Sequence, residues 1–129
     1  MHENEISERV IGAAIEVHRI LGPGLLESVY ELALCHELSL RGIHFVRQQK
    51  VPVLYKGIKF DTELRLDLLV EDKVIVDLKA RDELSPIGKL KLLSYLRLLD
   101  KHLGLIINFH VGLLRDGIYR VVNNLKESY

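Results

Sequence analysis

The segment RLDLLVEDKVIVDLKA, residues 65–80, decides the fold, because it sets three charged side chains inside two otherwise apolar β-strands. The two strands flank residues 71–73, a polar tripeptide that predicts the loop of a β-hairpin. The charged side chains within the strands are Asp67, Asp77 and Lys79. Whether the two carboxylates meet depends on the register of the hairpin, since neighbouring side chains of a strand point to opposite faces.

A loop of three residues makes one face of this hairpin wholly apolar. Its pairs are Val70 with Val74, Leu68 with Val76, and Leu66 with Leu78. The other face then pairs Leu69 with Ile75, Asp67 with Asp77, and Arg65 with Lys79. A two-residue loop would mix charged and apolar residues on both faces and bury carboxylates at a high desolvation cost. The odd-length loop is therefore favoured.

Two carboxylates at opposed positions of a hairpin repel each other, so a cation or a shared proton must lie between Asp67 and Asp77. Mg²⁺ suits such a sparse site, because it binds through one or two carboxylates, waters and phosphate oxygens. Lys79 projects to the same side as Asp77 and could stabilise charge on a phosphate. The pattern indicates metal-assisted phosphodiester hydrolysis. The alternative is a solvated sheet face with cross-strand ion pairs.

The chain before the hairpin predicts two helices. Residues 5–21 carry apolar side chains at spacings of three and four, and Gly-Pro-Gly at 22–24 ends that helix. A second helix is predicted over 25–41, with Gly42 just beyond its end. The side expected to be buried consists of Leu25, Val29, Leu32, Ala33, His36 and Leu40.

Residues 43–80 change to a period of two and predict three or four antiparallel strands, with a turn at 56–57. Ser85-Pro86 begins a helix that continues to residue 102, and the apolar run 103–112 predicts a strand covered on both faces. A turn at 115–117 leads to a strand over 118–122. The order ααββββαββ predicts a mixed α/β or α+β fold, with residues 1–129 as one domain.

Composition excludes several classes of protein. Lys and Arg balance Asp and Glu at 18 each, so the net charge does not indicate a nucleic-acid binder. No apolar run is long enough to span a membrane, and the polar N-terminus differs from a secretory signal. We expect a soluble cytoplasmic protein with no membrane partner. The single cysteine, Cys35, is expected to be a small buried residue rather than a catalytic thiol.

Three blocks in this order resemble the GxxExxY protein family of bacteria and archaea. They are GLLESVY at 24–30, the hairpin at 65–80, and LSPIGKLKLLSYLRLL at 84–99. That family is placed in the PD-(D/E)xK nuclease superfamily, and the resemblance covers about residues 5–123. It implies a restriction-endonuclease-like core, in which helices flank a mixed central sheet in αβββαβ order, preceded by an extra N-terminal helix.

The resemblance also implies roles for single residues. Asp67 resembles the first metal-binding carboxylate, Asp77 stands at the (D/E) position, and Lys79 is the lysine of the motif. Glu27 resembles a further carboxylate that a helix adds to the metal site. The implied catalytic set is Glu27, Asp67, Asp77 and Lys79, with Mg²⁺ or Mn²⁺ held by the three carboxylates.

Substrate contacts are expected from Tyr30, Lys91 and Tyr95. The helix after the core often carries Q-x-x-x-Y in this branch, and here Lys91 replaces the glutamine four residues before Tyr95. Gly88 stands where many members have histidine. Lys91 and Tyr95 share one helical face and are expected to contact a phosphate and a base or sugar. Tyr30 is either a substrate contact beside Glu27 or a core tyrosine with a satisfied hydroxyl group.

Two functions follow from these patterns. The first is a metal-dependent nuclease acting on nucleic acid, with DNA expected ahead of RNA. The second is a catalytically inactive module of the same fold that binds nucleic acid or a protein partner. A homodimer is also expected, because the apolar run at 103–109 and an exposed sheet edge offer a surface for association.

Overall fold

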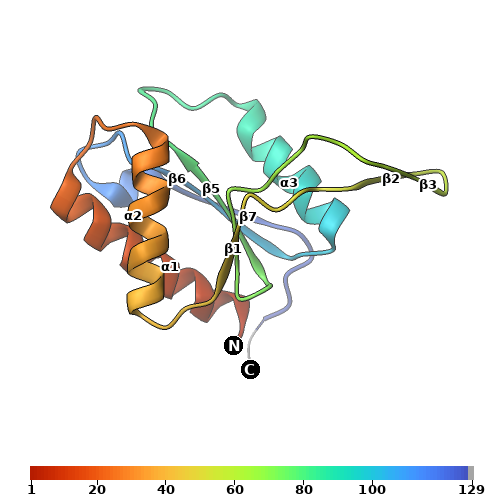
Figure 1. Ribbon diagram of the computed structural model, residues 1–129, viewed down its shortest axis with the longest axis horizontal. Helices are drawn as coiled ribbons and strands as arrows, with labels where there is room; N and C mark the ends of the chain where they lie inside the picture. The colour runs from red at the N-terminus through yellow and green to blue at the C-terminus, as the bar shows by residue number, and fades with distance from the viewer. Residues whose placement is uncertain (128–129) are drawn as a thin grey trace.

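A mixed five-stranded sheet between helices forms the body of the protein in the computed structural model, which describes residues 1–127 (Figure 1). Its strand order is β1-β4-β5-β6-β7, and only the β5–β6 pair is parallel. The helices are α1 (Glu3–Leu21), α2 (Glu27–Leu40) and α3 (Ile87–Leu99). The strands of this sheet are β1 (Phe45–Arg47), β4 (Leu68–Val70), β5 (Val74–Lys79), β6 (Leu103–Asn108) and β7 (Ile118–Val122), with a 3₁₀ turn at Leu114–Gly117.

The structure confirms the hairpin register and the order of the core elements. Val70 pairs with Val74 and Leu68 with Val76, so the loop between β4 and β5 has three residues. The run α2, β1, β4, β5, α3, β6 is the expected αβββαβ order, and α1 is the extra N-terminal helix. The predicted mixed α+β fold is therefore confirmed.

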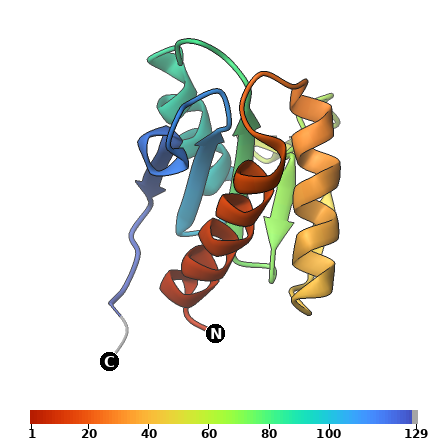
Figure 2. The ribbon, with the colours of Figure 1, turned by 90° about the vertical axis from the view of Figure 1, so that its left-hand side faces the viewer.

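Helices cover both faces of the sheet, as Figure 2 shows from the side. The first core cluster joins α1 and α2 to Leu68, Val76 and Leu105. The second joins α3 to Leu69, Ile75 and Ile106. Strand β6, between β5 and β7, is buried along its whole length, as its apolar sequence predicted. Apolar burial of this kind is the main favourable term in folding.

Gly104 on β6 allows α3 to lie close to the sheet. A Cβ atom at this position would come within 2.8 Å of Leu92 Cδ2, on α3. Packing therefore favours glycine, because any side chain here would force the buried Leu92 to shift. This close approach fixes the height of α3 above the sheet.

The hairpin differs from the expectations in two ways. Its second face is not the solvated sheet face of the alternative interpretation, because α3 packs against Leu69 and Ile75 and leaves only the end of that face for the charged residues. Leu66 was expected beside Leu78 but packs in the second cluster instead. The reason is a bend at Asp67, just before β4, which turns the preceding residue toward α3.

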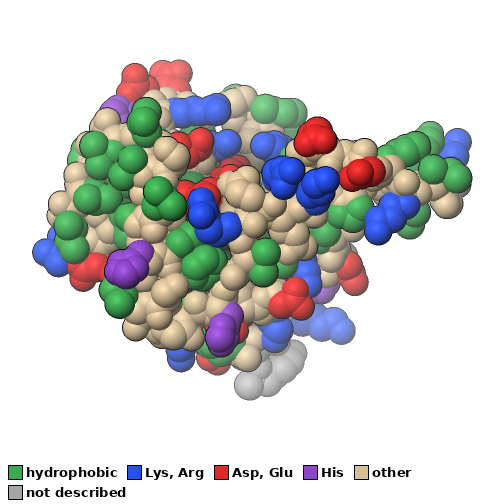
Figure 3. All heavy atoms as spheres, in the orientation of Figure 1, with side chains coloured by type: hydrophobic (Ala, Val, Ile, Leu, Met, Phe, Trp, Pro, Cys, Tyr) green, Lys and Arg blue, Asp and Glu red, His purple; other side chains and the backbone are tan. Residues whose placement is uncertain are grey.

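The predicted buried side of α2 is wrong. Leu25, Leu32 and Leu40 are exposed, whereas the helix buries Tyr30, Glu31, Leu34, Cys35 and Leu38. Helix α2 is apolar on two sides, so periodicity alone could not choose between them. The row that the structure buries also has helical spacing, at positions 30, 34 and 38, and the other row forms part of the apolar surface in Figure 3.

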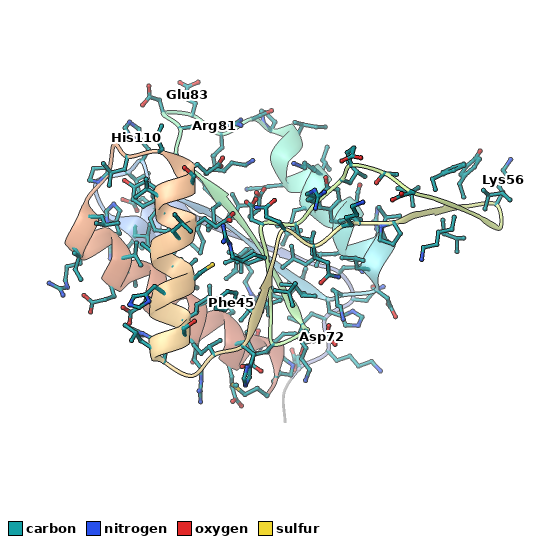
Figure 4. All side chains as sticks on the ribbon, in the orientation of Figure 1. Phe45, Lys56, Asp72, Arg81, Glu83 and His110 are labelled. Carbon is teal, nitrogen blue, oxygen red and sulfur yellow. The ribbon has the colours of Figure 1, made fainter. Side chains whose placement is uncertain are left out.

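A two-stranded arm, β2 (Val53–Tyr55) and β3 (Ile58–Phe60), extends away from the body (Figure 1). These strands were predicted within the main sheet, but they pair only with each other. Leu54, Tyr55, Ile58 and Phe60 are exposed along the arm, and Lys56 lies at its tip (Figure 4). The arm therefore adds little to the core, whereas Val51 and Leu66 at its base are fully buried.

Two further expectations concern the surroundings of the protein. Within residues 1–127, no helix is both long and apolar enough to cross a bilayer. Strand β6 lies between β5 and β7 in the sheet, so its apolar run is covered within the chain. The apolar run at 103–109 therefore gives no support to the expected homodimer.

Shortening the arm should leave stability almost unchanged. Val53 and Phe60 are directly paired, so replacing residues 54–59 by Asn-Gly closes the hairpin with a two-residue turn. Because the deleted side chains are largely exposed, we expect the urea midpoint to stay close to wild type. Leu66→Ala is the matched control at the arm's base and should cost about 2–5 kcal/mol. A shortened variant as unstable as Leu66→Ala would show that the arm belongs to the folding core.

Candidate active site

The carboxylate of Asp67 sits where the chain bends before β4. Its Oδ2 accepts a hydrogen bond of 2.8 Å from the backbone N–H of Leu78 on β5. The carbonyl oxygen of Asp67 accepts another, of 2.9 Å, from the N–H of Gln48. The side chain of Asp67 is thus fixed by β5, and its backbone carbonyl is fixed by Gln48, just after β1. The bend holds the Asp67 side chain at the edge of the second core cluster.

Asp77 follows Ile75 on the same face of β5, at the point where the core cluster ends. Burial raises the pKa of its carboxyl group from 3.8 to about 6. Lys79 opposes this shift, whereas a hydrogen bond to Asp67 and the charge of Asp67 add to it. The two carboxylates therefore share a site in which full ionisation of both is unfavourable. This confirms the predicted juxtaposition of the pair.

Lys79 and two residues of α3 complete the polar surroundings of the pair. Lys79 Nζ lies 3.6 Å from Asp77 Oδ1, and both side chains are largely buried, at 16% and 18% exposed. Tyr95 is buried against the same site, and its pKa is raised by burial and then by Asp77. Lys91 Nζ lies 5.5 Å from the centre of the Tyr95 ring. The structure thus brings Lys79, Lys91 and Tyr95 together around the carboxylates.

A small pocket of about 80 Å³ opens over these groups. Glu27, at the first turn of α2, reaches its rim, and Arg65 also lines it. Near the middle of the face in Figure 3, acidic side chains lie among Lys and Arg side chains. Among residues 1–127, however, no three His, Cys, Asp or Glu side chains are close enough to form a metal cluster. Of the three carboxylates expected to hold a metal, Asp67 and Asp77 form a close pair, and Glu27 lies at the rim of the pocket.

A hydrogen-bonded network around the buried Glu31, next to Asp67, was missed by sequence reasoning. Glu31 is only 8% exposed and accepts hydrogen bonds from the guanidinium of Arg47, at 2.7 and 3.1 Å, and from Gln48 Nε2, at 2.9 Å. Gln48 Nε2 also reaches Asp67 Oδ1 at 3.5 Å. Gln48 has a φ of 53°, which is uncommon for a residue other than glycine. The only signal in the sequence was the position of Glu31, four residues after Glu27 on the same helix.

Tyr30 is a core residue and not a substrate contact. Its ring is fully buried and stacks on Phe109, with ring centres 4.4 Å apart. The hydroxyl group donates to the carbonyl of Gly22 at 2.5 Å and accepts from the N–H of Leu25 at 3.1 Å. No atom of the ring or hydroxyl is left for a substrate. Tyr30 instead fixes the link between α1 and α2, and thereby the position of Glu27 at the start of α2.

The residues of the pocket fit a hard divalent cation. Their donors are carboxylate oxygens, which Mg²⁺ and Mn²⁺ prefer. Burial and mutual repulsion already disfavour the doubly ionised pair, and a cation between Asp67 and Asp77 would relieve that repulsion. Cys35, by contrast, is buried away from the pair, and burial raises its pKa to about 11, so it is not a reactive thiolate.

Comparison with known proteins assigns the fold. The sequence model of one family, described as the PD-(D/E)XK nuclease superfamily, matches residues 4–121. This match spans the three helices and the five-stranded sheet, apart from the first residue of α1 and the last residue of β7, and agrees with a restriction-endonuclease-like arrangement. Searches of curated proteins and of solved structures gave no match.

Replacing Asp77 by asparagine should stabilise the metal-free protein at neutral pH. An acid whose folded pKa is raised contributes stability below its unfolded pKa and loses it as the pH rises through the folded value. Wild type therefore loses stability between about pH 4 and 6, whereas Asp77→Asn does not titrate there. In EDTA at pH 8, urea unfolding should show the variant about 1–3 kcal/mol more stable, with the difference vanishing near pH 4.

The control for that experiment is Asp61→Asn, because the Asp61 side chain is 90% exposed. It should change stability little at either pH. An Asp77→Asn variant that is less stable than wild type at pH 8 would contradict the description of Asp77 as a carboxylate held in an unfavourable site.

The Glu31 carboxylate should matter more to stability than that of Glu37 on the same helix, because its side chain is 10% exposed against 20% and it accepts three hydrogen bonds rather than one. Glu31→Ala removes these bonds from Arg47 and Gln48, so we expect a loss of about 1–3 kcal/mol in urea unfolding. Glu37→Ala is the matched control, since it removes a single hydrogen-bonded pair with Arg41, the residue after α2. Its expected cost is below about 1 kcal/mol. Equal losses would show that the network does not hold the fold together.

Proposed function

Because the chain belongs to the PD-(D/E)XK nuclease superfamily, we propose that it hydrolyses phosphodiester bonds of nucleic acid with the help of a divalent metal ion. The observation that carries this proposal is the pair Asp67 and Asp77 with Lys79 beside it in one small pocket. Two carboxylates this close to each other lower the stability of the fold when no cation lies between them. Their arrangement is therefore better explained by function than by folding.

Asp67 and Asp77 would hold Mg²⁺ or Mn²⁺, and Glu27 would join them from the rim of the pocket. When bound, the ion supplies positive charge against a phosphate oxygen and lowers the energy of the charge that builds up during displacement. The Leu78 N–H keeps Asp67 Oδ2 in place, and Gln48 lies against Oδ1. A backbone N–H of β5 and the side-chain amide of Gln48 thus orient the oxygens of Asp67 in advance.

Lys79 has the position expected of a group that assists the attack of water. Its ammonium group lies next to Asp77 in a largely buried site, where a charge acts more strongly than in bulk water. It can donate to a water or a phosphate oxygen while staying close to the carboxylate. Lys91 would hold the phosphate as a point charge, and the Tyr95 hydroxyl would contact the strand beside it.

The position of Glu27, at the rim of the pocket, favours a second candidate function. Because no three-carboxylate cluster exists within the described residues 1–127, the chain could bind nucleic acid or a protein partner without cutting. Metal binding separates the two functions. Mn²⁺ should raise the melting temperature of the nuclease and not that of Asp77→Asn, whereas a binding module would be indifferent to metal.

The direct test is incubation of the protein with labelled DNA and RNA, single- and double-stranded, in Mg²⁺, Mn²⁺ or EDTA. We expect cleavage with either metal, none in EDTA, and at least about a 100-fold loss in Asp77→Asn and in Lys79→Ala. Lys73→Ala, in the exposed loop of the hairpin, is the matched control and should keep full activity. Cleavage that persists in both site variants would come from a contaminant and would overturn the proposal.

A further inference from the structure

A second and much larger cleft adjoins the catalytic pocket. Its volume is about 760 Å³, within the range of pockets that enclose a small ligand. Lys79 and Lys91 line both hollows, so the two adjoin at these side chains. The pocket over the carboxylates, at about 80 Å³, has room for a phosphate group and little more. A nucleotide attached to that phosphate therefore has the larger cleft as its nearest enclosed space.

The lining of this cleft suits a base and its phosphate. Ile106, Val111 and Tyr119 provide apolar and aromatic surface. Lys89 Nζ lies 4.8 Å from the centre of the Tyr119 ring, so the cleft combines an aromatic face with a cation. Flat aromatic surfaces bind unpaired bases by stacking, and neighbouring cations bind the backbone. The first turn of α3 also lines the cleft and directs its partial positive charge there.

The charges that face the cleft are mainly positive. Asp82 and Glu83 also belong to its lining and are exposed, as are Arg81, Lys89 and Lys91, but the four cations of the lining outnumber these two carboxylates. The Asp82 carboxylate is 89% exposed and pairs with His110 at 2.7 Å, and Glu83 extends away from the body (Figure 4). Lys79, Lys89, Lys91 and Arg81 remain as the cations of the wall. The cleft thus favours an anionic ligand.

A buried side chain fixes the backbone of one wall of the cleft. Asn108, at the end of β6, is 4% exposed and binds both backbone groups of Arg81. Its Oδ1 accepts from the Arg81 N–H at 3.1 Å, and its Nδ2 donates to the Arg81 carbonyl at 2.9 Å. The start of the loop between β5 and α3 is therefore fixed. A wall that is preformed in this way binds without first having to be ordered.

We propose that this cleft binds one unpaired nucleotide next to the scissile phosphate, which makes single-stranded nucleic acid the substrate. The inference rests on the proposed nuclease function and names its substrate class. Walls from the loop at 81–86, from α3 and from β6 and β7 surround the cleft. A base can enter only after it leaves a duplex, and that cost is lowest where the strand is already unpaired.

Binding without cleavage tests this inference separately from catalysis. Fluorescence anisotropy in EDTA would compare the affinity for a labelled single strand of about 12 nucleotides with the affinity for the matching duplex. We expect the single strand to bind at least about tenfold more tightly. Lys89→Ala should weaken single-strand binding about five- to tenfold and lower its salt dependence, since one phosphate contact is lost. Tyr119→Leu keeps the apolar volume and should weaken binding to a similar extent with the salt dependence unchanged.

Lys126→Ala removes one exposed charge near the start of α1 and is the matched control. It should change affinity by less than about twofold. Equal affinity for single strand and duplex, absence of binding, or a loss in Lys89→Ala no larger than in Lys126→Ala would each overturn the inference. Cleavage without single-strand preference would leave the nuclease proposal intact and remove this one. Preferential single-strand binding without metal-dependent cleavage would remove the nuclease proposal and keep the cleft as a binding site for an unpaired nucleotide.

Discussion

The hydrogen bond from the Leu78 N–H to Asp67 Oδ2 is the contact on which the site depends. Asp67 lies just before β4. Its side-chain oxygen therefore accepts the hydrogen bond that a backbone carbonyl would accept in a regular pair of strands. The bend that results turns Leu66 toward α3 and holds the Asp67 carboxylate beside Asp77. One local departure from regular sheet geometry thus produces both the packing of the second core and the pair of carboxylates.

Two separate supports keep the elements around this bend in place. On one side, Glu31 holds Arg47 and Gln48, and Gln48 in turn contacts Asp67. On the other side, Leu92 packs where Gly104 leaves space and sets the height of α3. Lys91 and Tyr95 owe their place over the carboxylates to that packing. The site is therefore positioned by rigid elements, as catalytic groups require.

Stability and function oppose each other at the carboxylate pair. Burial and mutual repulsion raise the pKa of Asp77, so the free energy of folding is less favourable at neutral pH than it would be with a neutral side chain there. Groups of this kind are typical of functional sites, where a ligand supplies the missing charge. The neighbouring cleft carries an excess of cations, which agrees with the proposed binding of a phosphate and an unpaired base beside the carboxylate pair.

The sequence by itself determined the hairpin register, the meeting of Asp67 with Asp77 and most of the element order, although five strands precede α3 where three or four were predicted. Each of these follows from local rules: strand side chains alternate, a loop has an odd or even length, and charges avoid the core. Tertiary structure alone decided which side of α2 is buried, because that helix has two apolar rows and only its neighbours select one. It also placed Tyr30 in the core, detached the β2–β3 arm from the main sheet, and formed the large cleft. These features depend on contacts between segments far apart in the chain, such as Tyr30 with Phe109 and Arg81 with Asn108, which no local pattern encodes.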